Sequence, residues 1–102
     1  MPAPFDKIDY MPLATFAFEA LAVAGTSIGF TAATIANAIC ATAKVETAQI
    51  RYRTDGTAPT ATVGVIADVG DVLTIWGSAD IQAFRAIRSG ATSATLSTEF
   101  QR

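Results

Sequence analysis

Short stretches of alternating apolar and polar residues cover most of the chain, which is the pattern of half-buried β-strands. The clearest stretches are residues 15–23, 41–53, 72–76 and 94–100, and most are bounded by Gly, Asp or Ser turn signals. Six or seven short strands separated by turns are typical of a small sandwich or barrel. The pattern therefore predicts an all-β fold, a small antiparallel β-sandwich or barrel, as a single domain over residues 13–102.

The first strand, residues 15–23, has two faces that the alternation separates. Phe16 and Phe18 share one face with two alanines, and Glu19 and Leu21 lie on the other. The Phe16 and Phe18 face is predicted to be the core face.

Residues 41–54 change parity in the middle of the stretch. Apolar residues occupy odd positions up to Glu46 and even positions from Ala48 onward. Because a shift of one residue turns every side chain to the opposite face, a bulge or bend is predicted near Glu46 and Thr47, where the strand can pass from one sheet to another. Tyr52 then points inward, and Arg51 and Arg53 share the outer face.

A turn follows at Asp55-Gly56, a pair that is typical of type I′ hairpins because both residues tolerate positive φ. Pro59 comes soon after and cannot donate to a central ladder, so the returning chain is predicted to be a loop or an edge strand.

Two stretches allow a helix as well as a strand. Residues 31–44 fit a short helix capped by Thr31, or a strand with a loop, and we favour the strand and loop. Residues 81–88 fit a helix through Ile81, Phe84 and Ile87, or a strand that points Phe84 inward and Arg85 outward.

The first twelve residues contain three prolines, at positions 2, 4 and 12, with Phe5 and Tyr10 among them. Proline disfavours both a helix and a central strand. Residues 1–12 are therefore predicted to be an extended arm whose aromatic residues anchor it to another surface, or else a disordered tail.

Composition narrows the classes of function. Of the 102 residues only four are leucine, so the core is expected to be thin and the chain is expected to gain by packing against copies of itself. A net charge of −2 favours neither nucleic acid nor membrane as a partner. The absence of histidine and the single cysteine, Cys40, exclude a disulfide, the usual zinc sites and a histidine triad within one chain. No cofactor is expected, and Cys40 is predicted to be a small buried residue.

The apolar run from Leu13 to Gly25 ends in small residues, as signal peptides do. However, Lys7 is flanked by two aspartates and Glu19 interrupts the run. We expect neither secretion nor a membrane span, and we expect synthesis in a cytoplasm.

Other classes of function rest on single features. Two of the aspartates Asp55, Asp68, Asp71 and Asp80 could act as a glycosidase pair, and Asp68 with Asp71 could contribute to a Ca²⁺ site, but carboxylates in turns are usually only solvated. Trp76 beside Gly77 could stack on a sugar, although a lone tryptophan is more often part of a core.

Four segments taken in order, AQIRYRTDGTAPTATVG, VGDVLTIWG, AFRAIRSGAT and ATLSTEFQ, resemble a family of small proteins encoded among the virion-structure genes of tailed bacteriophages. The resemblance covers roughly the last two thirds of the chain. It implies a non-enzymatic decoration or cement protein on the capsid surface, made in the host bacterial cytoplasm. The implied partners are the major capsid protein of the shell lattice and copies of the chain itself, as a homotrimer. The candidate interface residues are Phe5, Tyr10, Arg51, Arg53, Trp76 and Arg85.

Overall fold

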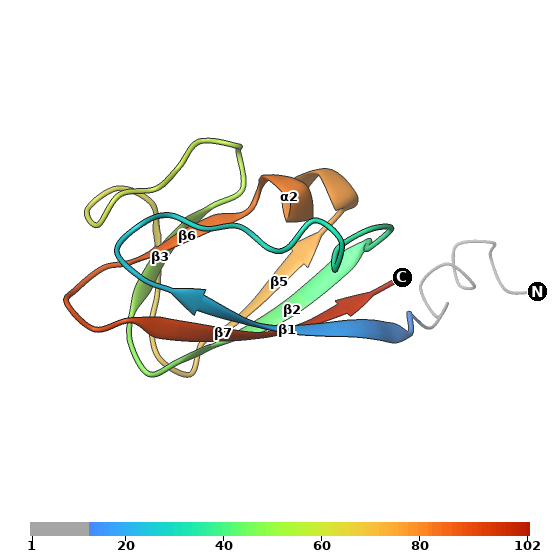
Figure 1. The fold of residues 1–102 in the computed structure, drawn as a ribbon, viewed down its shortest axis with the longest axis horizontal. Coiled ribbons are helices and arrows are strands. Elements are labelled where there is room, and N and C mark those ends of the chain that lie inside the picture. Colours follow the sequence, from blue (N-terminus) through green and yellow to red (C-terminus); the bar gives the residue numbers. More distant parts are fainter. Residues whose placement is uncertain (1–12) are drawn as a thin grey trace, which may run out of the picture.

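The computed structural model describes residues 13–102, so the predicted arm, with Phe5 and Tyr10, lies outside the described residues. Two antiparallel sheets enclose one hydrophobic core, which confirms the predicted all-β fold (Figure 1). One sheet has four strands in the order β1-β7-β2-β5, and the other has three in the order β4-β3-β6. The elements are β1 (Thr15–Val23), β2 (Cys40–Glu46), β3 (Ile50–Arg53), β4 (Val65–Ala67), β5 (Val72–Trp76), α2 (Ser78–Ala83), β6 (Arg85–Arg88) and β7 (Ala94–Gln101).

The parity change near Glu46 marks the crossing from one sheet to the other, as predicted. β2 ends at Glu46 in the four-stranded sheet, and β3 begins at Ile50 in the three-stranded sheet. Between them Thr47 has a φ of 80°, a left-handed conformation that lets the chain turn between layers. Ile50 is fully buried, and Tyr52 packs partly buried against the core.

The prediction for the core face of β1 was wrong. Leu21 and Val23 are buried, whereas 60% of the Phe18 surface is exposed. The face that is buried follows from the pairing with β7, because Leu21 lies opposite Leu96 and Val23 opposite Ala94, and both partners point into the core.

The opposite face of β1 is not entirely open to solvent. A register irregularity between Thr15 and Ala17 lets Phe16 pack partly against the core cluster. The Arg102 guanidinium carbon lies 4.2 Å from the Phe16 ring centroid, which is a cation–π contact.

The two ambiguous stretches resolve differently. Residues 31–39 form turns and β2 follows, so the favoured strand and loop are correct. Residues 81–88 are helical at the start and a strand at the end. Ile81 is buried on α2, and Ala86 is buried on β6 with Arg85 outward.

Aromatic rings from distant segments form the centre of the core. The ring of Phe84 stacks on Phe30 at 4.6 Å between centroids and on Tyr52 at 5.7 Å. Phe30 also meets Phe100 edge-on at 5.0 Å. These contacts join the two sheets and the chain segment that follows β1.

The turn at Asp55-Gly56 is not a two-residue type I′ hairpin, because Gly56 has a φ of 85° but Asp55 is not in the positive-φ region. The chain instead reverses through a loop over residues 54–64. It returns as β4, which is an edge strand, as Pro59 predicted. None of the helices within residues 13–102 is long and apolar enough to span a membrane.

Candidate functional site

The outward arginines of β3 bind within the chain. Arg51 donates from Nε to the carbonyl of Ala61 at 3.0 Å and from a terminal nitrogen to the carbonyl of Gly64 at 2.9 Å. Its fork-shaped guanidinium thus holds the far side of the 54–64 loop against β3. Arg51 is therefore a structural residue of the loop, and its outward orientation was predicted correctly.

Arg53 is engaged by the turn that follows it. Its guanidinium forms an ion pair with Asp55, with a further hydrogen bond from Nε to Oδ1 at 3.0 Å. The backbone N–H of Thr57 also donates to Asp55 Oδ1, at 3.1 Å. The hydrogen bond from Arg53 is the main reason that the pKa of Asp55 is lowered, and the same contact raises the pKa of Arg53.

The Asp55 carboxyl is expected to titrate below its ordinary range, and Arg53→Gln is expected to move its pKa upward. Because the folded-state pKa is lowered, the contribution of the pair to stability is present above the ordinary carboxyl range and is lost as the pH falls through the lowered pKa. NMR titration of the Asp55 side-chain carboxyl carbon, in the wild type and in the Arg53→Gln variant, measures both values. An Asp55 pKa that is unchanged in the Arg53→Gln variant contradicts the assignment.

Arg85 has neither a salt bridge nor a side-chain hydrogen bond within residues 13–102, whereas Arg51 binds loop carbonyls and Arg53 binds Asp55. It lies on β6 directly opposite Arg53, a like-charge pairing that is unfavourable unless one charge is compensated. Asp55 compensates the charge of Arg53, and the exposed guanidinium of Arg85 stays available on the outer surface. Beside it, Ile66 and Ile87 flank Arg51 on the same outer surface.

Trp76, a candidate interface residue, lies on the surface and not in the core, where a lone tryptophan is more often found. It is 64% exposed at the end of β5, where the alternation that buries Ile75 turns Trp76 outward. Val72, four residues earlier on the same face of β5, is 59% exposed. Phe18 points to the same outer side from β1, at the opposite edge of the four-stranded sheet.

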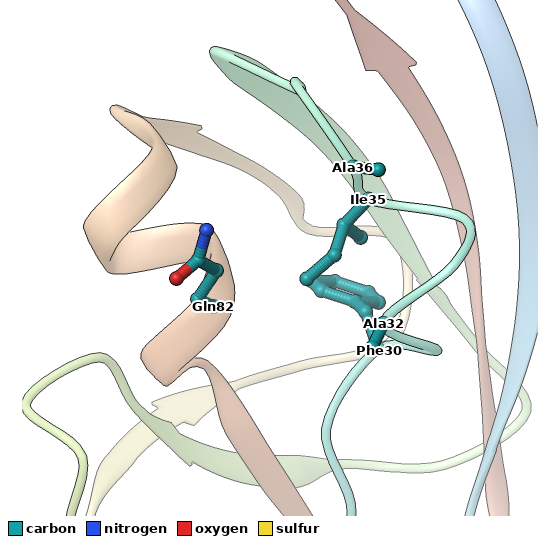
Figure 2. A pocket seen from close by; sticks show the side chains of 5 residues that line it. All are labelled: Phe30, Ala32, Ile35, Ala36 and Gln82. Carbon is teal, nitrogen blue, oxygen red and sulfur yellow. The ribbon is translucent and has the colours of Figure 1, made fainter.

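A hollow of about 450 Å³ lies between α2 and the segment that precedes β2. Figure 2 shows Gln82 projecting from α2 on one side, with the side chains of the other segment facing it; the lining residues are Phe30, Ala32, Ile35, Ala36 and Gln82. None of these side chains is ionisable. The hollow therefore suits contact with an apolar group, with the Gln82 amide as its one polar side chain, and offers no acid or base for catalysis.

Asp68 and Asp71, the aspartates considered as Ca²⁺ ligands, have other partners. Asp71 accepts a hydrogen bond from the backbone N–H of Asp68 at 2.8 Å, and Asp68 accepts one from the Gln49 amide. Within residues 13–102 no three acidic, histidine or cysteine side chains gather closely enough to hold a metal ion. These carboxylates act as turn residues.

Cys40 is buried, as predicted, and burial raises the pKa of its thiol. A thiol that stays protonated is a poor nucleophile, so Cys40 acts as a small core residue.

Comparisons of the chain with protein families, curated proteins and solved structures found no match. The assignment of function therefore rests on three features of the described surface: the region around Arg85, the exposed apolar residues of the four-stranded sheet, and the apolar hollow.

Proposed function

We propose that this chain is a non-enzymatic structural protein of a bacteriophage particle, a decoration protein that binds the outside of the head as a homotrimer and stabilises the shell. The major capsid protein is the proposed partner, and the capsid surface is the proposed location. No nucleic acid, membrane or cofactor takes part in this role.

The observation that carries the proposal is the placement of the segments that resemble phage virion proteins. RYRTDG and AFRAIR lie on paired strands, β3 and β6, with Arg51 opposite Ile87 and Arg53 opposite Arg85. The third segment, GDVLTIW, forms a turn and then β5. Two of the four segments thus build one continuous outer surface, which carries Ile87 together with the arginines of both strands. That chemistry supports adhesion to another protein surface.

A cement role follows from repetition over a lattice. A trimer seated where three capsomers meet can contact the shell through several weak patches at once, and the combined attachment is strong because the later contacts are intramolecular. Arg85 is proposed to face acidic shell groups. The arm of residues 1–12 is proposed to lay Phe5 and Tyr10 into apolar grooves of the shell.

The copy number per purified particle tests the proposal directly. Quantitative mass spectrometry against the major shell protein is expected to find this chain at a copy number on the scale of the shell protein. A few to a few tens of copies per particle place the chain in the neck, the tail or a fibre instead. Absence from the particle overturns the virion role.

Deleting residues 1–12 is expected to abolish binding to undecorated heads while the fold of residues 13–102 is kept. Binding is measured by co-sedimentation with heads, and folding by far-ultraviolet circular dichroism and the melting temperature. A matched double variant, Phe5→Ala with Tyr10→Ala, is expected to lose most of the binding with the arm length unchanged. Full binding by the deletion variant contradicts the arm mechanism.

A second candidate, a carbohydrate- or receptor-binding module of the particle, is favoured by the exposure of Trp76 beside Gly77. In that case Trp76→Ala is expected to remove attachment of particles to host cells without changing the copy number per particle. The decoration role predicts unchanged attachment.

A further inference from the structure

The four-stranded sheet ends in two open edges, β1 on one side and β5 on the other. β1 has nine residues, with Glu19 as its one charge and no proline or lysine. β5 has five residues and no charge. Long, apolar edges without charged or proline residues are ready templates for pairing with another strand.

The hydrogen bonds show which backbone groups of these edges are free. The N–H of Val45 bonds the carbonyl of Asp71, and the N–H of Gly77 bonds the carbonyl of Ile39, so the odd-numbered residues of β5 face β2. The even-numbered residues of β5 therefore direct their N–H and C=O groups away from the sheet: Val72, Thr74 and Trp76.

The same reasoning applies to β1. Ala14 and Arg102 exchange hydrogen bonds at 3.3 and 3.2 Å, so the even-numbered residues of β7 face β1, where they meet the odd-numbered residues of β1. The even-numbered residues that follow the irregularity in β1 therefore point their backbone groups away from β7. Just beyond the strand, the carbonyl of Ala24 accepts a hydrogen bond from the N–H of Arg88. The outward groups before it have no hydrogen-bond partner within residues 13–102, and these belong to Phe18, Ala20 and Ala22.

The free backbone groups coincide with exposed apolar side chains. Phe18, Val72 and Trp76 are three of the most exposed large apolar residues, at 60, 59 and 64%. All three project from the outer face of the four-stranded sheet, at residues whose backbone groups are also unpaired. Within the part of the chain that the structure describes, each edge thus lacks both an apolar neighbour and a hydrogen-bonding neighbour.

We propose that β1 of one copy pairs with β5 of a second copy, which joins the four-stranded sheets of neighbouring copies head to tail. Strand directions alternate across the sheet, so β1 and β5 of one copy are antiparallel. A second copy in the same orientation continues that alternation and keeps its outer face on the same side.

One register satisfies both edges. Phe18 lies opposite the partner's Trp76, Ala20 opposite the partner's Thr74, and Ala22 opposite the partner's Val72. Each pair exchanges two hydrogen bonds, so about six form between copies. The two exposed aromatic rings become a cross-strand pair, which is a favourable contact in antiparallel sheets.

Pairing of β1 with the β1 of a second copy is less favourable. The register that pairs all of its free residues sets Ala20 opposite Ala20 at the two-fold axis and Phe18 opposite the partner's Ala22, so the two exposed Phe18 rings do not meet as a cross-strand pair. It also leaves Trp76 and Val72 exposed.

A head-to-tail contact closes into a ring or continues as a filament. The contact stands independently of the virion role, and only the expected closure at three copies rests on the proposed function. Because the contact is measured on the isolated protein, its failure is distinct from failure to bind a capsid.

Two proline variants test the contact, since each removes an outward N–H and no hydrogen bond inside the sheet. Light scattering is expected to show that the wild type has about three times its chain mass of 10.6 kDa, whereas Ala20→Pro and Thr74→Pro are monomers. Ala20→Ser and Thr74→Ser keep the N–H and are expected to behave as the wild type. Circular dichroism identifies any variant that does not fold.

Mixing the two proline variants gives the decisive result. Ala20→Pro retains a usable β5 and Thr74→Pro retains a usable β1, so an equimolar mixture is expected to form dimers. The emission of Trp76, the one tryptophan of the chain, is expected to shift to shorter wavelength in that mixture. A wild type that stays monomeric, an oligomer that survives in Thr74→Pro, or a mixture without dimers overturns the proposal.

Discussion

Replacing Phe84 by alanine is expected to lower the free energy of unfolding by about 3–5 kcal/mol, the usual loss for a buried phenylalanine. Phe84 is fully buried, and its ring stacks on Phe30 and on Tyr52. Its removal leaves a cavity between the two sheets and deletes both stacking contacts. A domain of this size has about 5–15 kcal/mol in total, so the variant is expected to be close to its unfolding threshold.

Thermal and urea unfolding measure this loss. The melting temperature is expected to fall by at least about 12 °C, because 1 kcal/mol corresponds to about 4–8 °C in a domain of this length. Val69→Ala is the control: an apolar side chain is truncated at an exposed position outside the proposed contact between copies, and a change within about 0.5 kcal/mol is expected. Equal losses for the two variants contradict the assignment of Phe84 to the centre of the core.

Gly29→Ala is expected to destabilise the fold by about 1–3 kcal/mol, the range for inserting a methyl group where there is no space. The added Cβ lies 2.8 Å from the carbonyl oxygen of Phe84, a backbone atom. The adjacent backbone cannot easily move away, because Ile28 and Ala86 exchange hydrogen bonds at 2.9 Å in both directions. The two segments must separate, and the bridge between Ile28, in the segment that follows β1, and Ala86 of β6 is lost.

Gly90→Ala is the control for this substitution. A Cβ at Gly90 meets nothing within 4 Å, and Gly90 is not in the positive-φ region. It is expected to be neutral, or to stabilise by about 0.4–1 kcal/mol because the unfolded chain loses freedom. If Gly29→Ala is as stable as Gly90→Ala in urea unfolding, the close approach to Phe84 is not a constraint.

Alternation predicted the strands well where one face is apolar and the other polar. In β7 the buried residues are Ala94, Leu96, Thr98 and Phe100, every second residue of the stretch 94–100 in which alternation predicted a strand. In β1 both faces carry apolar residues, so the pattern alone could not choose between them. The register with β7 decides, and that register comes from contacts between residues about eighty positions apart.

The surface was less predictable than the strands. Alternation correctly directed Arg51 outward, but its partners are carbonyl groups of a loop whose shape no pattern specifies. Glu19 accepts hydrogen bonds from the N–H and the hydroxyl of Thr31, at 3.1 and 2.8 Å. This contact was missed for the same reason, because it depends on the shape of a loop. Tryptophan is buried in most proteins, but the position of Trp76 in the strand is the better guide. The alternation of β5 that buries Ile75 places Trp76 outward.

The pairing of the first strand with the last has a consequence for the speed and order of folding. β1 has one strand neighbour, β7, and the chain segments at residues 14 and 102 are hydrogen-bonded to each other. On a ribosome, the edge of the four-stranded sheet cannot form until β7 has emerged from the exit tunnel. Loop closure over nearly the whole chain makes such topologies slow, with refolding times of milliseconds to seconds. The first strand stays without its one strand neighbour during that interval.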